Sequence, residues 1–123
     1  VVNEPVNGAV RIITAYTPVR SAEPGTTLTA DGLTLLKVDL ITGKSHQIRA
    51  HLASVGHPLA GDTKYGDEDL NRFFRERYDI RSQLLHACEV EFFGMTGILE
   101  YLNGLLIEAP MPDRFRRVME DVL

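Results

Sequence analysis

The sequence predicts a single α+β domain in which helices pack on a mixed, mainly antiparallel sheet. Segments 9–19 and 33–41 are rich in β-branched residues or alternate between apolar and polar residues, as strands do. Apolar residues recur at helical spacing near 45–55, 68–79 and 112–123. The 123 residues suit one domain, and a hydrophobic content of 44% is enough for its core.

The two expected strands come first in the chain. Residues 9–19, AVRIITAYTPV, form the first one, and the turn signals EPG (23–25) and ADG (30–32) separate it from the second. Residues 33–41, LTLLKVDLI, alternate in polarity, which predicts a strand buried on one face. The apolar face would hold Leu36, Val38 and Leu40, opposite Lys37 and Asp39.

A helix is expected directly after the second strand. Ser45 is a suitable N-cap, because its hydroxyl can accept a hydrogen bond from a free backbone N–H of the first turn. Ile48, Leu52 and Val55 then recur at i, i+4 and i+7 and form one apolar stripe. Gly56 is well placed just past the end of this helix, where a left-handed conformation is common.

The next elements are a second helix and a third strand. Residues 68–79 place aromatic and aliphatic side chains on one helical face, and residues 84–93 form an apolar run typical of a strand. The inner face of the helix would hold Leu70, Phe73, Phe74 and Tyr78, and one face of the strand would hold His86, Cys88, Val90 and Phe92.

A hairpin and a last helix complete the expected fold. Asn103-Gly104 separates two apolar runs within residues 98–109, and this dipeptide favours a type I′ hairpin turn. Residues 112–123 then predict a helix capped by Asp113. Its core-facing residues would be Phe115, Val118, Met119 and Val122.

Cysteine usage and hydropathy bear on the compartment. Cys88 is the sole cysteine, so no disulfide can form within the chain, which favours a reducing compartment. No apolar run reaches the length of about eighteen residues that a membrane span needs. The first residues show no basic stretch followed by an apolar one, as a secretory signal would. We therefore expect a cytoplasmic protein in which Cys88 is a small buried hydrophobic residue.

The charge distribution leaves two interpretations open. The net charge of −4 argues mildly against a nucleic-acid partner, but the distribution of charge matters more than its sum. Arginines gather in two segments, each interleaved with acidic residues, which fits either solvated helix faces or a surface that faces RNA. These arginines are Arg72, Arg75, Arg77 and Arg81 in the first segment, and Arg114, Arg116 and Arg117 in the second.

Arg49 is the residue whose position calls for a partner. On a helical wheel it lies about 100° from the apolar stripe and beside Ser45 and His46, near the start of the helix. That end of a helix is electropositive because its N–H groups are unpaired. An arginine there predicts an anion site, occupied by a phosphate or a carboxylate. The alternative is an arginine that extends from a half-buried position into water.

The histidines and glycines of the same segment have simpler interpretations. His46 and His51 are five residues apart, on different helix faces, and His57 lies beyond the helix, so the set fits a zinc site poorly. Histidines hydrogen-bonded within the fold are the better expectation, with no metal. Gly61-Asp62 predicts a turn in which Asp62 accepts hydrogen bonds from nearby backbone N–H groups.

The run TGKSHQIRAHLASVGHPLAGDTKYG (42–66) resembles the signature TGR-x-HQIR-x-H-L…GHP-x-x-GD-x-x-YG of RNA pseudouridine synthases of the RluA type. LLHA (84–87) resembles the L-H-A strand of that family, and IEAPMP (107–112) resembles its A-P-L-P segment. VRIITAYTPV (10–19) is similar to the strand that precedes the signature. Lys44 stands where arginine is common in the family.

This resemblance implies an activity and roles for several residues. The family isomerises uridine to pseudouridine in structured RNA without a metal or cofactor, on a uridine flipped out of its helix. Large-subunit ribosomal RNA is the expected substrate, and transfer RNA is also open. Arg49 corresponds to the arginine that ion-pairs with the catalytic aspartate. Supporting roles are implied for His46, Gln47, Ile48 and Leu52, and the RNA-binding candidates are Lys44, Arg72 and Arg75. The alternative is a non-catalytic RNA-binding module with the same fold.

The family's catalytic aspartate lies in an R-L-D-x-x-T-S-G segment, and no Arg-Leu-Asp occurs in this chain. The resemblance therefore implies that residues 1–123 are the C-terminal portion of a catalytic domain, without its nucleophile-bearing half and inactive alone. A sheet cut midway would have an open edge and an uncovered apolar face. We expect self-association through that surface.

Overall fold

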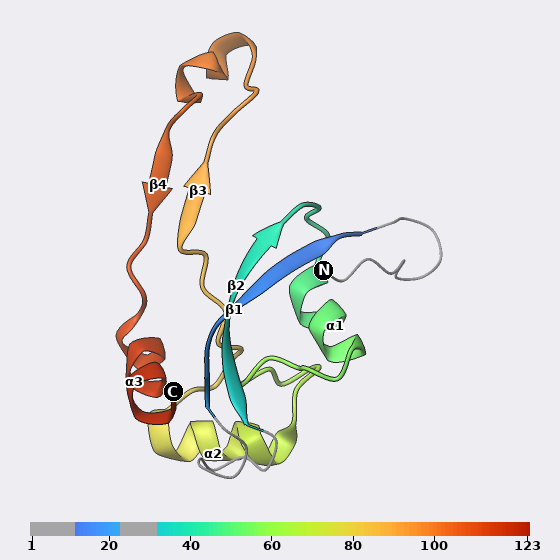
Figure 1. Ribbon diagram of the computed structural model, residues 1–123, viewed down its shortest axis with the longest axis vertical. Helices are drawn as coiled ribbons and strands as arrows, with labels where there is room; N and C mark the ends of the chain where they lie inside the picture. The colour runs from blue at the N-terminus through green and yellow to red at the C-terminus, as the bar shows by residue number, and fades with distance from the viewer. Residues whose placement is uncertain (1–11, 23–31) are drawn as a thin grey trace.

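The computed structural model describes residues 12–22 and 32–123, and these residues form an α+β arrangement (Figure 1). The expected fold class is therefore confirmed. The strands form two separate two-stranded antiparallel sheets, β1–β2 and β3–β4, where the sequence predicted one larger mixed sheet. The elements are β1 (Thr14–Ala22), β2 (Leu33–Leu40), α1 (Gln47–Ser54), α2 (Glu68–Tyr78), β3 (Glu89–Glu91), η1 (Gly97–Leu102), β4 (Leu106–Glu108) and α3 (Asp113–Val122).

The first sheet confirms both predicted strands. β1 and β2 pair from Thr14 opposite Leu40 to Ala22 opposite Leu33, with one irregularity between Pro18 and Arg20. The start of the predicted first strand (9–11) and the turn signals at 23–31 lie outside the described residues. Leu36 and Val38 are half-buried as expected, but Leu40 is 58% exposed. Leu40 is the last residue of its strand, and its side chain is not packed into the described core.

Helix α1 ends as predicted and begins differently. Gly56 has a φ of 87°, and its N–H and that of His57 close the helix end on Ala53 and Leu52. The predicted N-cap Ser45 is wrong: the cap position is His46, which has a left-handed φ of 54° and no side-chain cap. The buried face is also rotated, because Gln47 and His51 face inward and hydrogen-bond to residues near β1, while Val55 is 40% exposed.

The main apolar cluster lies between α2 and α3. Phe74 and Tyr78 of α2 pack with Ile80 and with two residues of α3, Val118 and Val122. Asp67 caps α2 by accepting a 2.8 Å hydrogen bond from the Leu70 N–H. The helix predicted over 112–123 is confirmed, but its N-cap is Pro112, and Asp113 lies in the first turn. The aromatic face predicted for the second helix is confirmed at Phe74 and Tyr78, with Leu70 and Phe73 partly buried against the same cluster.

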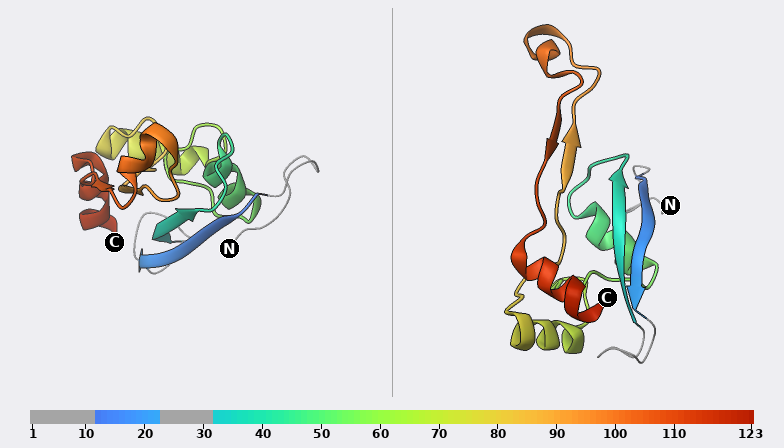
Figure 2. Two further views of the ribbon diagram at one scale, coloured as in Figure 1. Left: turned by 90° about the horizontal axis from the view of Figure 1, so that it is seen from above. Right: turned by 60° about the vertical axis from the view of Figure 1, so that its left-hand side comes forward.

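Residues 88–109 form an arm that projects from this body (Figures 1 and 2). Strand β3 covers only three residues of the predicted strand 84–93, and it pairs with β4. Asn103 and Gly104 do not form a type I′ turn: their φ values of −58° and 82°, with a 2.9 Å hydrogen bond from Leu105 N–H to Leu102 C=O, are those of a type II turn after η1. Cys88 is exposed, contrary to expectation, because no other described segment packs over it at the start of the arm.

Within the described residues, no helix is long and apolar enough to cross a membrane.

Candidate functional site

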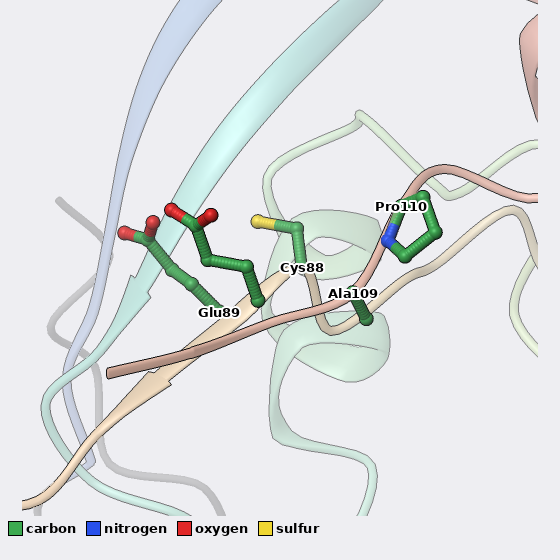
Figure 3. A pocket seen from close by; sticks show the side chains of 5 residues that line it. Cys88, Glu89, Ala109 and Pro110 are labelled. Carbon is green, nitrogen blue, oxygen red and sulfur yellow. The ribbon is translucent and has the colours of Figure 1, made fainter. Parts of the chain in front are cut away.

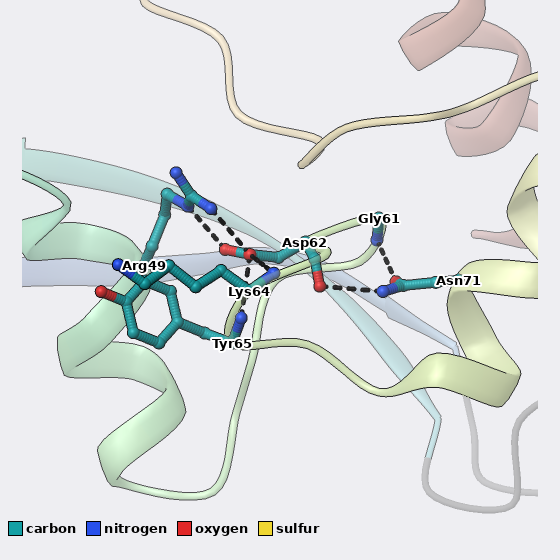
Figure 4. A network of polar contacts seen from close by, with 6 residues as sticks. All are labelled: Arg49, Gly61, Asp62, Lys64, Tyr65 and Asn71. Atoms are coloured by element: carbon teal, nitrogen blue, oxygen red, sulfur yellow. Dashed lines mark hydrogen bonds and ion pairs between the residues drawn. The ribbon is translucent and has the colours of Figure 1, made fainter.

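The candidate site is built on an ion pair between Arg49 of α1 and Asp62 of the loop that precedes α2 (Figure 4). Arg49 Nε lies 2.7 Å from Asp62 Oδ2, and Nη2 lies 2.9 Å from Oδ1. The Asp62 side chain is fully buried and that of Arg49 is 13% exposed. Two parallel N–H···O bonds of this kind fix the orientation of a guanidinium as well as its position.

The loop itself holds the Asp62 carboxylate. Oδ1 also accepts hydrogen bonds from the backbone N–H groups of Lys64 (2.9 Å) and Tyr65 (3.0 Å), as the sequence predicted for a turn at this aspartate. The hydrogen bonds from Arg49, helped by these two N–H groups, hold the pKa of Asp62 far below its usual value even though burial opposes this. The same pair raises the pKa of the Arg49 guanidinium. Both groups are charged in the folded chain.

Asn71 of α2 fixes the loop from its other side. Its Oδ1 accepts a 2.8 Å hydrogen bond from Gly61 N–H, and its Nδ2 donates a 2.8 Å hydrogen bond to the Asp62 carbonyl. Gly61 has a φ of 81°, and a Cβ there would lie 2.3 Å from the Ser82 carbonyl oxygen. Only glycine fits that position, so the backbone just before Asp62 has one arrangement.

The ring of Tyr65 completes the surroundings of Arg49. The Arg49 Cζ lies 5.4 Å from the ring centroid, and the Lys64 ammonium lies 5.2 Å from it. His46 packs edge-on against the same ring at 6.0 Å. Cations near an aromatic face are attracted to its negative quadrupole. The ring therefore limits the directions in which the guanidinium can turn.

A second polar network, around Gln47, holds α1 against β1. The Gln47 amide donates to the Ile13 carbonyl (2.8 Å) and to Thr14 Oγ1 (3.0 Å), and its oxygen accepts from Thr42 Oγ1 (2.9 Å) and Lys44 N–H (3.1 Å). These contacts use the hydrogen-bonding capacity of a buried amide. They fix the start of the helix on which Arg49 stands.

The structure brings some of the predicted residues together and separates others. Arg49 has the anion that its position called for, but the carboxylate belongs to this chain, which the sequence analysis did not foresee. Nη1 of Arg49 has no hydrogen-bond partner among the described residues. Gln47 and Leu52 are buried, Ile48 is half-buried, and His46 and Lys44 are exposed. Arg72 and Arg75 lie on α2, apart from the pair, and Arg72 contacts Asp69 at 3.2 Å.

Asp62, Tyr65 and Asn71 are the site residues that sequence reasoning missed. The sequence predicted a turn in which Asp62 accepts backbone hydrogen bonds, and it indicated no role for Tyr65. Asn71 lies on a helix face whose other inward residues are aromatic, so nothing in the sequence distinguishes it from a buried polar residue without a role. The contacts of all three cross between segments, which spacing along the chain does not reveal.

Two other groups of residues offer no comparable site. Among the described residues, no cluster of three or more His, Cys, Asp or Glu side chains has the arrangement of a metal site. His51 is buried and shares a 2.9 Å hydrogen bond with Thr14 Oγ1. A shallow hollow at the base of the arm contains none of the predicted site residues (Figure 3). Its lining consists of Cys88, Glu89, Glu108, Ala109 and Pro110.

Comparison with known proteins finds relatives over most of this chain, although no family model matches it. It is 39% identical over 108 residues to the tRNA pseudouridine synthase C of Vibrio cholerae, in an alignment that covers 78% of this chain and 44% of that protein. It is 34% identical over 90 residues to the ribosomal large subunit pseudouridine synthase C of Buchnera aphidicola (73% and 27%). The protein of the same name from Escherichia coli O157:H7 is 38% identical over 88 residues (71% and 26%). The chain spans less than half the length of these relatives.

Proposed function

Because the chain belongs to the RNA pseudouridine synthases of the RluA type, we propose that it forms the arginine-bearing side of an active site that converts uridine to pseudouridine in structured RNA. The observation that carries this proposal is the bidentate pair of Arg49 and Asp62. Large-subunit ribosomal RNA is the first candidate substrate, and transfer RNA is the second, since relatives of both names occur.

The pair prepares Arg49 to hold a second carboxylate. A guanidinium has five N–H donors, and Asp62 engages two of them. The donors on Nη1 are directed away from Asp62, have no partner among residues 12–22 and 32–123, and can hydrogen-bond a catalytic aspartate, which keeps that carboxylate ionised and oriented toward the uridine. Asp62 already balances the charge of Arg49, so this second contact works through directed hydrogen bonds more than through net charge.

The nucleophilic aspartate itself is proposed to come from polypeptide outside these 123 residues. The eight aspartates of the chain include none in an Arg-Leu-Asp context. Asp62 is fully buried, and its carboxylate is committed to Arg49 and two backbone N–H groups, so it is a poor nucleophile. On this proposal residues 1–123 are the C-terminal portion of a catalytic domain, and the chain alone does not isomerise uridine.

The proposed supporting roles follow from the contacts around α1. Gln47 fixes the start of the helix on β1, and Leu52 anchors its inner face. Ile48, which is half-buried, and His46, which contacts Tyr65, form the wall beside Arg49. Lys44, Arg72 and Arg75 are exposed cations that RNA can reach. A cytoplasmic location is part of this proposal, since RNA modification takes place where the RNA is made and used.

Self-association, which the sequence analysis expected at the edge of a truncated sheet, is a further part of the proposal, and we now place it at the arm. Large apolar side chains on the arm are exposed, with Ile98 at 91% and Phe93 at 80%. Large exposed apolar side chains gathered on one segment favour contact with another protein surface. Sedimentation of the purified chain over a range of concentrations tests it: association should grow with concentration, and a monomer at every concentration would contradict it.

A chimera tests the catalytic proposal. The aligned region of the Vibrio cholerae tRNA pseudouridine synthase C would be replaced by this chain, and pseudouridine formation would be followed by tritium release from RNA labelled at uridine C5. We expect activity from the chimera and its loss in Arg49→Met, with Arg20→Met, at an exposed position of β1, as a matched control. A folded chimera that is inactive, or active without Arg49, would overturn the proposal. Turnover by the 123-residue chain alone would overturn the claim that its nucleophile lies elsewhere.

A further inference from the structure

Two cations converge on the ring of Tyr65. The Arg49 guanidinium lies 5.4 Å and the Lys64 ammonium 5.2 Å from its centroid. Figure 4 shows the Lys64 side chain alongside the ring, with its ammonium directed toward the Tyr65 hydroxyl side rather than toward Asp62. Two like charges beside one ring repel each other unless an anion lies near them.

The nearby carboxylate balances only one of these cations. A carboxylate offers about four hydrogen-bond acceptor positions, and Asp62 receives four bonds, from Arg49 Nε and Nη2 and from the N–H groups of Lys64 and Tyr65. Three of these bonds fall on Oδ1 and one on Oδ2, and the Lys64 ammonium is not among the donors of the buried Asp62 carboxylate. Lys64 is exposed and forms no ion pair with any acidic group among the described residues.

Most arginines of the arginine-rich segments differ from Lys64 in this respect. Four of the seven are already in contact with acidic side chains of their own surface, whereas Arg75, Arg77 and Arg117 have no ion pair among the described residues. These contacts are Arg72 with Asp69, Arg81 and Arg114 with Asp79, and Arg116 with Asp113. An RNA phosphate that approached them would also meet those carboxylates. Of the two cations beside the Tyr65 ring, Lys64 is the one that no acidic side chain of the described residues balances.

We propose that Lys64, held against the Tyr65 ring, binds a backbone phosphate of the RNA substrate beside the nucleotide that reaches Arg49. This inference rests on the proposed function, because it takes RNA to be the ligand of this surface. The ring restricts the lysine side chain before RNA arrives, which lowers the entropic cost of fixing its ammonium on a phosphate. Lys64 thus positions the RNA and takes no part in bond breaking.

The test compares two lysines that differ in their partners. Binding of a fluorescein-labelled RNA stem–loop to the purified chain would be measured by anisotropy over a series of salt concentrations for wild type, Lys64→Gln and Lys37→Gln. Lys37 is a matched control because it is also exposed but contacts Glu89 at 3.6 Å. Because Lys64→Gln loses one phosphate contact, the plot of log K for RNA binding against log salt should become shallower, with the magnitude of its negative slope reduced by about 1. Lys37→Gln removes the same charge and should leave the slope unchanged.

A second pair of variants tests the role of the ring. Tyr65→Leu removes the aromatic face and should weaken RNA binding in the direction of Lys64→Gln, and Tyr65→Phe, which keeps the face, should weaken it less. An unchanged slope in Lys64→Gln, or equal effects of both lysine variants, would overturn the inference while RNA binding itself stands. Absence of RNA binding by the wild-type chain would overturn the proposed RNA partner, and the inference with it.

Discussion

Arg49 and Asp62 lie thirteen residues apart in the chain and meet side-on, with Nε 2.7 Å from Oδ2 and Nη2 2.9 Å from Oδ1. One residue is on α1 and the other is in a loop that α2 holds through Asn71. The pair therefore links three segments of the fold. A site arginine that must present its remaining N–H groups in one direction needs such a link, because an unpaired guanidinium samples many rotamers.

Replacing Asp62 by asparagine should strongly destabilise the chain. The asparagine side chain is neutral, so the largely buried Arg49 guanidinium would lose its counter-charge. Its amide N–H group would also face one of the Arg49 N–H donors in place of an acceptor oxygen. Breaking a buried pair by removing one partner costs about 3–5 kcal/mol, which urea unfolding followed by circular dichroism would measure.

The control for this change is Asp69→Asn, which removes the partner of Arg72 in an exposed ion pair. Exposed pairs contribute about 0–1 kcal/mol, so this variant should unfold almost as the wild type does. Equal losses from Asp62→Asn and Asp69→Asn would mean that the site pair is no more important than a surface contact.

The lowered pKa of Asp62 predicts how this stabilisation depends on pH. The carboxyl has a lower pKa in the folded chain than in the unfolded chain, so the unfolded chain binds more protons as the pH falls. The contribution is fully present above about pH 5, roughly one unit above the unfolded pKa of about 3.9, and is lost as the pH falls from there toward the folded pKa. The difference in unfolding free energy between wild type and Asp62→Asn should therefore shrink over that acid range.

The measurement is a series of urea unfolding curves for both proteins between neutral and acid pH. Asp79→Asn gives a comparison, because the pKa of Asp79 is also lowered, by Arg81 and Arg114, on an exposed surface. Its effect should be small at every pH. A difference between wild type and Asp62→Asn that stays constant through the acid range would contradict the assignment of the low pKa to this pair.

Local patterns in the sequence were enough to predict most elements of the body. Both long strands and all three helices depend on periodic apolar residues and on end signals such as Gly56, and these act within a few residues of each other. The need of Arg49 for an anion also followed from its position near a helix start. Each of these expectations rested on a pattern formed by residues that are close together in the sequence.

The errors share a different cause. The inward rotation of Gln47 and the pairing of β3 with β4 both depend on contacts between distant segments. The apolar periodicity predicted that Val55 is buried, because the prediction counted only apolar side chains as facing the core. In the structure Gln47 and His51 face inward instead, and they are held there by hydrogen bonds near β1. The partner of Arg49 was missed for the same reason, since thirteen residues of chain fold back before Asp62 meets it.

Gly61 should tolerate no side chain. Gly61→Ala would place a Cβ 2.3 Å from the Ser82 carbonyl oxygen at a φ of 81°, so the loop must move and Asp62 must move with it. Gly56→Ala is the matched control, because its φ of 87° is similarly left-handed but no atom lies within 4 Å of the added Cβ. The control should cost about 1 kcal/mol, the price of the backbone conformation alone. Thermal unfolding of both variants checks this, and equal losses would exclude a steric role for Ser82.

Asn71→Asp should loosen the loop under Asp62 far more than the same change does elsewhere. The Asn71 side chain accepts a hydrogen bond from Gly61 N–H and donates one to the Asp62 carbonyl. The Asn103 side chain makes the same two kinds of bond, both with the backbone of Met95. The two asparagines differ in burial: Asn71 is 6% exposed, and Asn103 lies on the open surface of the arm. A carboxylate at position 71 would face the Asp62 carbonyl oxygen without a proton to share and without water to solvate it.

The loss of unfolding free energy in the Asn→Asp variants should be about 1–3 kcal/mol or more at position 71 and well below that at position 103. Urea unfolding of the two variants at neutral pH measures this difference, and hydrogen exchange of the Gly61 amide should accelerate in Asn71→Asp only. Similar losses at both positions would mean that burial of the Asn71 side chain does not stabilise the loop, and that the Arg49–Asp62 pair holds its geometry without help from α2.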